Sequence, residues 1–453
     1  MRLLRPIFFT VFLVSVSQCA NIQADSIQEK SLLIQKSAAN KVWRGIAAIQ
    51  PQKIEIMEGN SWHGRPLPSE KLIANLSRYD AILVAQIISH YNRIGWEKFA
   101  EATPEILKLY YFSCNTARPQ GGMGYLNYNF IETNHPEWFL LKDADKFKSM
   151  GYLIADNRIR WEPRDTKSTS YNRFYLDIGN KEFQQWAAEY FLKHATGEAD
   201  ELRHRFDGIF LDNVNIGFNR WSGLAKQYPN FKYAVSADSW NNAFLEYLHV
   251  IRNRLKEQNL ILMVNHNLDY GTDIDERCWQ ILYKAVDGVT SEKPLSRKGN
   301  EPLYGGQQWE KAILRHEEII SHGLFDCWLT YPSIKRDKQH DEFMYAYCSW
   351  LLIRETGKSL FFASKDSKES VAWYNEYEAS LGKPLSKRYQ INECWLRDFE
   401  NAKVIVNPTN RSKNLSLSHG IFWIEYGTSN TVETATLLPK SGKIFMKVGY
   451  EKK

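Results

Sequence analysis

Two short apolar runs of this chain each end in a carboxylic acid. Residues 206–215 read FDGIFLDNVN and carry Asp212 at the end of the run, and residues 286–293 read VDGVTSEK and carry Glu292 in the same position. Glycoside hydrolysis needs two carboxyl groups, one to protonate the leaving oxygen and one to attack the anomeric carbon or activate water. Asp212 and Glu292 are therefore our candidate catalytic pair.

The surroundings of the two acids suggest different roles. Asp212 is followed by Asn213 and Asn215, whose amide donors would keep a carboxylate ionised. In contrast, Glu292 follows residues 289–291, one apolar and two small side chains, which offer it less solvation. A less solvated carboxyl holds its proton and can act as the acid. We assign Asp212 as nucleophile and Glu292 as acid/base. Taken singly, Asp212 is also explained as the cap of a turn or of the next helix, and Glu292 as a solvated loop residue paired with Lys293.

Other polar and aromatic residues are candidates for binding a sugar. An indole face can cover a sugar ring, and a carboxylate can accept from two hydroxyls. The alternative is that Trp138 and Trp161 pack the insertion onto the barrel and that His266 is an ordinary loop histidine. The predicted substrate contacts are Asn265, His266, Asn213, Asp177, Trp161, Trp138, Tyr331 and His63.

Eight strands are expected to position these residues. Continuous apolar runs of this length are typical of parallel strands buried on both faces. Amphipathic stretches such as 239–258 and 340–357, the second followed by Gly357 as a stop, separate the runs and indicate helices. Strand and helix in alternation predict an α/β fold, a (β/α)8 barrel whose catalytic groups come from the carboxyl ends of the strands. The runs are 44–50, 81–86, 107–113, 208–213, 260–265, 288–293, 326–332 and 359–364.

Two regions interrupt this alternation. Residues 114–185 form a long polar and aromatic insertion after the third strand, and such insertions are usually functional. From Cys394 onward, short strand patterns with turn signals predict a small β-sandwich, in which Trp423 is either a buried anchor or a sugar contact. We expect a barrel over residues 25–390 and the sandwich over 391–453.

The N-terminus predicts export. Arg2 and Arg5 precede an apolar run that is too short to cross a bilayer, and small residues follow it, as in a secretory signal covering residues 1–24. The alternative is a lipobox-like sequence ending at Cys19, which would anchor the protein to a membrane. We expect a periplasmic or extracellular protein, with an outer-membrane lipoprotein as the second option.

Charge and composition narrow the function. The net charge of +6 includes two arginines of the signal, and no Lys/Arg-rich run is present, so nucleic acid is not an expected partner. The six cysteines show no metal-ligand spacing, although one disulfide stays open, and the 11 histidines form no HxH or HxxxH pair at a strand end, which disfavours a metal-dependent hydrolase. We expect a monomer without metal or cofactor that binds a polysaccharide or oligosaccharide. The alternative from another class is a non-catalytic carbohydrate-binding barrel.

The order of these motifs resembles a known group of proteins. FDGIFLDNVN, then LILMVNHN, then VDGVTSEKP resembles the glycosyl hydrolase-like family 15 group of exported barrels and is similar to the endo-α-1,4-polygalactosaminidase family. The segments at 134–147 and 175–186 and the run CWLRDFENAKVIVNPT also resemble the first group. The resemblance implies a glycosidase with the family aspartate at Asp212, the asparagine at Asn265 and the glutamate at Glu292. We expect this glycosidase to be retaining. His266 departs from the pattern, because a glycine often follows the asparagine.

Overall fold

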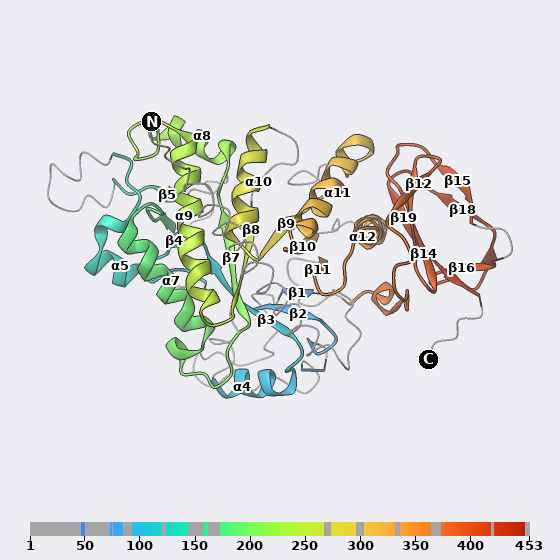
Figure 1. Ribbon diagram of the computed structural model, residues 1–453, viewed down its shortest axis with the longest axis horizontal. Helices are drawn as coiled ribbons and strands as arrows, with labels where there is room; N and C mark the ends of the chain where they lie inside the picture. Colours follow the sequence, from blue (N-terminus) through green and yellow to red (C-terminus); the bar gives the residue numbers. More distant parts are fainter. Residues whose placement is uncertain are drawn as a thin grey trace, which may run out of the picture. The chain divides into compact units, whose positions relative to one another are not determined.

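Eight parallel strands form one sheet, in the order in which they occur along the chain (Figure 1). The first strand, β1, and the last, β11, also contact each other, so the ends of the sheet meet. The predicted (β/α)8 barrel is confirmed, and each strand overlaps one of the predicted runs. The strands are β1 Ala47–Ile49, β2 Ala81–Val84, β3 Leu107–Ser113, β7 Gly208–Val214, β8 Ile261–His266, β9 Gly288–Glu292, β10 Phe325–Thr330 and β11 Ser359–Ala363.

This computed structural model describes part of the chain. The described residues are 47–49, 73–74, 76–84, 93–119, 124–143, 157–161, 173–266, 273–295, 303–330, 336–363, 373–417 and 421–448. The predicted signal peptide, Cys19, His63 and Tyr331 lie outside these ranges. Within them, no helix has both the length and the hydrophobicity that a membrane crossing requires.

Helices cover the outside of the barrel because the strands are apolar on both faces. All six residues of β8 are buried, as are all five of β11. Helix α9 begins after the N-cap Ser236 and buries Phe244, Leu248 and Ile251 at helical spacing. Gly357 lies in the turn before β11, not directly at the end of α12. The helices are α4 Arg93–Ala102, α7 Lys181–Ala195, α8 Phe218–Gln227, α9 Ala237–Lys256, α10 Asp273–Ala285, α11 Gly306–Ser321 and α12 Arg336–Leu351, with short 3-10 turns η4 Glu198–Asp200 and η5 Asn375–Glu378.

The insertion after β3 has a small sheet of its own. Its three strands pair antiparallel in the order β4-β6-β5, and its chain leads into α7. Apolar side chains of the insertion join the main core of the barrel, among them Trp138, Phe139 and Phe174. The elements are β4 Thr116–Ala117, α5 Tyr128–Asn134, η2 Pro136–Trp138, β5 Arg160–Trp161 and β6 Arg173–Tyr175.

A second, antiparallel domain follows the barrel. Six strands pair in the order β12-β13-β14-β19-β16-β17, and a separate pair, β15 and β18, packs on one face of this sheet. In β14, Val404 and Val406 belong to the core shared with α12, whereas Ile405 packs toward β15 and β18. Both faces are buried, which explains the apolar reading of this strand. Trp423 is 2% exposed and is therefore an anchor of the domain core. The strands are β12 Tyr389–Ile391, β13 Cys394–Asp398, β14 Ala402–Asn407, β15 Lys413–Ser416, β16 Trp423–Glu425, β17 Thr431–Val432, β18 Thr434–Leu437 and β19 Ser441–Lys447.

Candidate active site

The registers of β7, β8 and β9 decide which side chains face the barrel interior. Asn265 pairs with Thr290, and His266 pairs with Ser291. Successive residues of a strand point to opposite faces. The His266 ring packs edge to face on Trp279 of α10, with centroids 4.4 Å apart, so the His266 face looks outward to the helices. The Asn265 face therefore looks inward, and Glu292, two residues after Thr290, shares it.

Asp212 accepts four hydrogen bonds. On Oδ1 the donors are the backbone N–H of Asn213 at 2.7 Å and Nδ2 of Asn265 at 2.9 Å. On Oδ2 they are Nδ2 of Asn213 at 2.9 Å and the hydroxyl of Tyr111. Donors of this kind stabilise the charged form of a carboxylate. The four donors fix the orientation of the Asp212 carboxylate. Of the two following asparagines only Asn213 donates to it, and Asn265 and Tyr111 are donors in place of Asn215.

A local break in the sheet lets Asn213 donate twice. The pairing of β7 with β8 shifts register between Leu211 and Val214, and Asn213 has a left-handed φ of 61°. Asparagine tolerates this conformation better than most residues. Lys293, directly after Glu292, also has a positive φ, 53°. Positive φ values at non-glycine residues cluster at functional sites.

Asn265 bridges the two predicted catalytic acids. Its Nδ2 donates to Asp212 Oδ1 at 2.9 Å and to Glu292 Oε1 at 3.1 Å. Because both bonds share one nitrogen, the two acceptor oxygens lie no more than about 6 Å apart. The Oδ1 of Asn265 is buried and has no hydrogen-bond partner among the described residues. The structure thus brings together Asp212, Asn213, Asn265 and Glu292.

The burial of the two acids is the reverse of what we expected. Glu292 is exposed, whereas Asp212 is half-buried. The reason is that residues 288–291 of β9 are buried and Glu292 is the last residue of the strand, at the rim. Limited solvation in the free protein therefore does not mark Glu292 as the acid. The four donors on Asp212 become the main distinction between the two groups.

His266 occupies a packed position behind the strand. Only 5% of its side chain is exposed, and its Nε2 lies 3.3 Å from Ser291 Oγ. Burial, with smaller contributions from His316 and Arg315, lowers the pKa of His266 to about 3. This placement favours the alternative of a structural histidine over a sugar contact.

Two predicted sugar contacts in the insertion are also engaged in packing. Trp138 is 2% exposed and stacks on His135 with ring centroids 3.8 Å apart, so little of its face is open to a ligand. Asp177 is 8% exposed and accepts from Lys232 Nζ at 2.7 Å, from Gly179 N at 3.1 Å and from the Tyr233 hydroxyl. The structure favours a packing role for Trp138. Asp177 holds Lys232, Gly179 and Tyr233 together through its hydrogen bonds.

The remaining predicted contacts have no described side chain. Trp161 belongs to β5, but its side chain is outside the description, and His63 and Tyr331 lie outside the described residues altogether. Their roles stay predictions.

Tyr111 is the site residue that we did not predict. It lies in the run LKLYYFS, two positions before Ser113, and Ser113 pairs with Asp212 in the register of β3 and β7. Strand parity alone places Tyr111 on the same face as Asp212. A continuous apolar run hides this parity, because every position looks equally suited to burial.

Metal-ligand geometry occurs away from the carboxylate pair. Among the described residues, one group could hold a metal ion, formed by His135, Glu137 and Glu182. These side chains belong to η2, its N-cap and the first turn of α7. Neither Asp212 nor Glu292 is part of the group. All five described cysteines are buried, and no disulfide joins any two of them.

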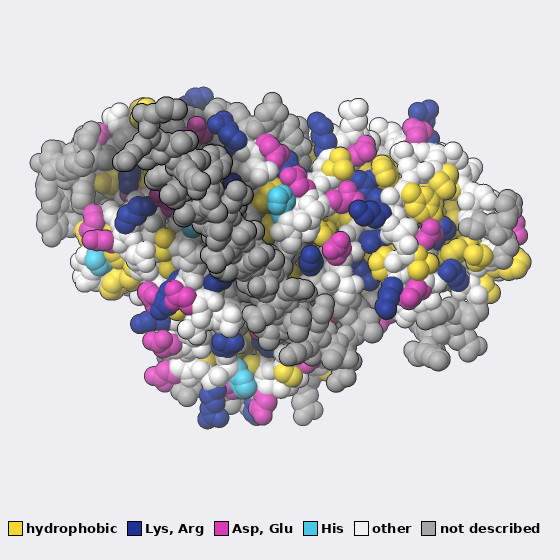
Figure 2. All heavy atoms as spheres, in the orientation of Figure 1, with side chains coloured by type: hydrophobic (Ala, Val, Ile, Leu, Met, Phe, Trp, Pro, Cys, Tyr) yellow, Lys and Arg dark blue, Asp and Glu magenta, His cyan; other side chains and the backbone are white. Residues whose placement is uncertain are grey.

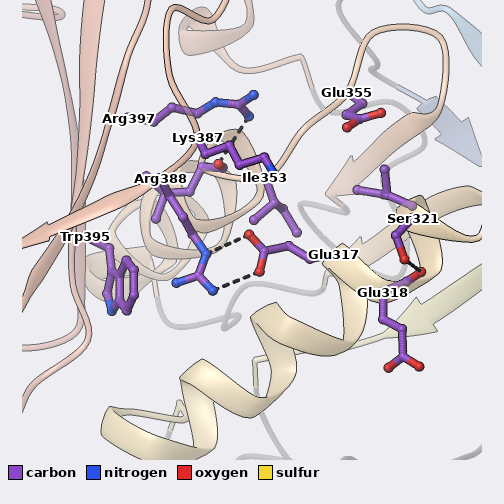
Figure 3. Close-up of a pocket in the computed structure, with 11 residues that line it drawn as sticks. Glu317, Glu318, Ser321, Ile353, Glu355, Lys387, Arg388, Trp395 and Arg397 are labelled. Carbon is purple, nitrogen blue, oxygen red and sulfur yellow. Dashed lines mark hydrogen bonds and ion pairs between the residues drawn. The ribbon is translucent and has the colours of Figure 1, made fainter.

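A cavity of about 540 Å³ lies at the opposite end of the barrel (Figure 3). It lies between the C-terminal ends of α11 and α12 and the C-terminal domain, and none of the predicted site residues lines it. One of its charged groups, Arg388, bonds to protein: it donates twice to Glu317, both at 2.8 Å, and its guanidinium lies 4.0 Å from the centre of the Trp395 ring. The cavity is therefore part of the junction between the barrel and the C-terminal domain.

Comparison with known proteins identifies the family. The model of a family described as hypothetical glycosyl hydrolase family 15 matches residues 104–403, which include Tyr111, Asp212, Asn265 and Glu292. The chain belongs to this family. It is accordingly an enzyme of the glycoside hydrolase type that acts on glycosidic bonds. The finer similarity to the endo-α-1,4-polygalactosaminidase family stays a prediction, and no curated protein sequence matches this chain.

Solved structures share the fold of this family 15 chain. An isomaltulose synthase from Klebsiella sp. LX3 has 10% sequence identity and a TM-score of 0.52, over 90% of this chain and 100% of that one. A trehalulose synthase from Pseudomonas mesoacidophila MX-45 has 10% identity and a TM-score of 0.50, over 89% and 99%. At such identities the likeness concerns the fold alone.

Proposed function

We propose that this family 15 protein is an exported glycoside hydrolase that cleaves a polysaccharide or oligosaccharide with retention of anomeric configuration. Asp212 is the nucleophile and Glu292 the acid/base. The observation that carries the proposal is the single amide of Asn265 that donates to both carboxylates. Retaining enzymes place their carboxyl groups about 5–5.5 Å apart and inverting ones about 6.5–9.5 Å. The upper limit of about 6 Å here supports retention.

The reaction has two steps. In the first, an Asp212 oxygen attacks the anomeric carbon, the glycosidic C–O bond breaks, and the leaving oxygen takes the proton of Glu292. In the second, water attacks the same carbon, Glu292 accepts the water proton, and the bond to Asp212 breaks, which restores both acids. Each step inverts the anomeric carbon, so the product retains its configuration.

The contacts of the two acids support this division of labour. Four donors hold the Asp212 carboxylate in one orientation, as attack on an anomeric carbon requires. Glu292 stands at the exposed rim of the strand, where a polymer can enter and cover it. Covering by the substrate would remove water from Glu292 and favour the protonated acid.

The first experiment measures reducing-end release from a panel of bacterial and plant polysaccharides, including α-linked galactosaminogalactan. The proteins are the chain from residue 25 onward and its Asp212→Asn and Glu292→Gln variants. We expect wild type to cleave one polymer and both variants to lose at least about a thousandfold in kcat. Glu246→Gln is the matched control, because Glu246 is exposed on α9 and pairs with Lys181.

Product configuration then tests the mechanism. NMR of the first-formed sugar should show the anomer of the substrate. Azide should restore turnover to Asp212→Ala with the opposite anomer as product and to Glu292→Ala with the same anomer. An inverted first product would refute retention. Binding of a glycan without cleavage by wild type would favour the non-catalytic barrel.

A further inference from the structure

Tyr111 is clamped beside Asp212. It pairs with Phe210 in the register of β3 and β7, and the two rings stack with centroids 5.8 Å apart and planes 20° apart. On another side the backbone of Gly124 approaches so closely that a Cβ there would lie 2.9 Å from the Tyr111 ring. The ring is thereby fixed, and its hydroxyl points at Asp212 Oδ2.

We infer that Tyr111 is the positioning residue of the nucleophile. Its hydroxyl holds the Asp212 carboxylate in the free enzyme, and it stabilises this carboxylate again when Asp212 departs from the sugar in the second step. This inference rests on the proposed retaining mechanism. It assigns to β3 a part in the reaction that the carboxylate pair on β7 and β9 does not reveal.

Tyr111 differs from the other three donors on Asp212. The N–H of Asn213 belongs to the adjoining backbone, and the Nδ2 of Asn213 is on the same residue. The Asn265 amide is shared with Glu292. A phenolic hydroxyl can rotate about its C–O bond while the ring stays in place. Tyr111 can therefore release and recover Asp212 without a movement of the backbone.

The hydroxyl keeps its proton throughout. Burial, together with the nearby negative charge of Asp212, raises the pKa of Tyr111 well above its ordinary value of 10. Tyr111 is thus a donor over the whole range in which a glycosidase works, and it does not compete with Glu292 for the role of acid/base.

The two chemical steps need this donor unequally. When the Asp212 oxygen is esterified to the sugar, the carboxylate charge is gone, and the hydrogen bond weakens. When water attacks, the charge returns to Asp212 as the leaving group, and a donor in place stabilises it. Removal of the hydroxyl should therefore slow the second step more than the first, so that the glycosyl-enzyme accumulates.

The test compares Tyr111→Phe with wild type. We expect kcat to fall about tenfold or more, KM to fall with it, a burst of leaving group to appear in pre-steady-state kinetics, and a glycosyl adduct to appear in the intact mass. Tyr389→Phe is the matched control. Tyr389 donates to Asp398 Oδ2 at 2.8 Å in the C-terminal domain, so the control loses a bond of the same kind away from the site.

A second readout needs no substrate. Carbodiimide and an amine nucleophile modify carboxyl groups that they can reach, and peptide mass spectrometry locates the product. We expect Asp212 to be modified about tenfold faster in Tyr111→Phe than in wild type, because the Tyr111 hydroxyl no longer occupies Oδ2, and equally in Tyr389→Phe and wild type. Unchanged labelling of Asp212 in Tyr111→Phe would overturn the inference whatever the activity.

The outcomes separate the two proposals. If wild type cleaves no polymer of the panel, the proposed function fails. If wild type is active, Asp212→Asn is inactive, and Tyr111→Phe keeps the kcat and KM of wild type without an adduct, the proposed function stands and only the inference about Tyr111 is overturned.

Discussion

At the scale of single residues, Asn265 reduces the repulsion between the two acids. Asp212 Oδ1 and Glu292 Oε1 lie about 6 Å apart or less, so charges on both groups would repel each other. One neutral amide with two N–H groups bonds to both. The amide also sets the spacing on which the choice between retention and inversion depends. Its Oδ1 is buried and has no hydrogen-bond partner in the described part of the chain.

His266, on the opposite face of β8, leads to a prediction about pH. Its pKa of about 3 in the folded protein lies below the value of about 6.5 expected in the unfolded chain. As the pH falls from 6.5 towards 3, His266 takes up a proton in the unfolded chain but stays neutral in the folded protein. The free energy of unfolding therefore falls with the pH in this range. Urea unfolding should show that wild type loses up to about 1.4 kcal/mol per pH unit more than His266→Gln in this window.

The comparison of two proteins at each pH isolates His266 from other titrating groups. His322→Gln, which removes an exposed histidine at the end of α11, is the control for the loss of a histidine. Parallel pH profiles of wild type and His266→Gln would contradict the buried neutral state.

At the scale of elements, the Asp-Gly pairs at the starts of β7 and β9 make equivalent contacts with the neighbouring strands. Asp207 Oδ2 accepts from the backbone N–H of Lys108 at 2.7 Å, and Asp287 Oδ2 accepts from that of Leu262 at 2.9 Å. Each aspartate thus ties its strand to the preceding strand of the sheet. The glycine that follows lets the neighbouring chain come close. These pairs fix the strands whose far ends carry Asp212 and Glu292.

Gly208 gives the element scale its prediction. A Cβ at this position would lie 2.2 Å from the Ile261 carbonyl oxygen, so Gly208→Ala must push β8 away from β7. We expect the free energy of unfolding to fall by about 2–3 kcal/mol. In contrast, Gly223 of helix α8 has nothing within 4 Å of such a Cβ, and Gly223→Ala should stabilise by up to about 1 kcal/mol. Both variants are measured by thermal and urea unfolding. If Gly208→Ala and Gly223→Ala changed the free energy of unfolding equally, this account would be contradicted.

At the scale of the whole molecule, the C-terminal domain packs on helix α12 of the barrel. Apolar residues of α12 share one core with β14 and β19, so each part would expose apolar surface to water without the other. Arg397 of β13 adds a polar tie: its Nη1 donates to the carbonyls of Leu351, Leu352 and Arg354 at 3.2, 3.2 and 2.9 Å, which caps the end of α12. On the face drawn in Figure 2, basic and acidic side chains are interspersed over the described surface.

Arg397 gives the corresponding prediction. Burial, with a smaller contribution from Arg354, lowers its pKa to about 10, so the guanidinium is still charged at neutral pH. Arg397→Met keeps the length of the side chain but leaves several buried carbonyls without a donor, and we expect unfolding to cost about 3 kcal/mol less. Arg397→Lys should lose less, because an ammonium can satisfy part of the set. A urea midpoint of Arg397→Met equal to that of wild type would refute this tie.

The sequence by itself determined the architecture and the positions of the two acids that we propose as the catalytic pair. Eight apolar runs predicted eight strands, because strands buried on both faces have no choice but to be apolar throughout. Asp212 and Glu292 could be placed near each other because parallel strands of a barrel present their carboxyl ends at one mouth. Asn265 was found by the same rule.

Only the tertiary structure decided the faces and partners. Asn265 and His266 are neighbours in the chain, yet strand parity turns one towards the carboxylates and packs the other on Trp279. Tyr111 reaches Asp212 from β3, about a hundred residues earlier, through a register that no local pattern encodes. The burial of Glu292 and Trp138 also depends on what other elements cover them. Local sequence sets the apolar pattern of a strand, whereas the contacts of a side chain depend on closure of the whole sheet.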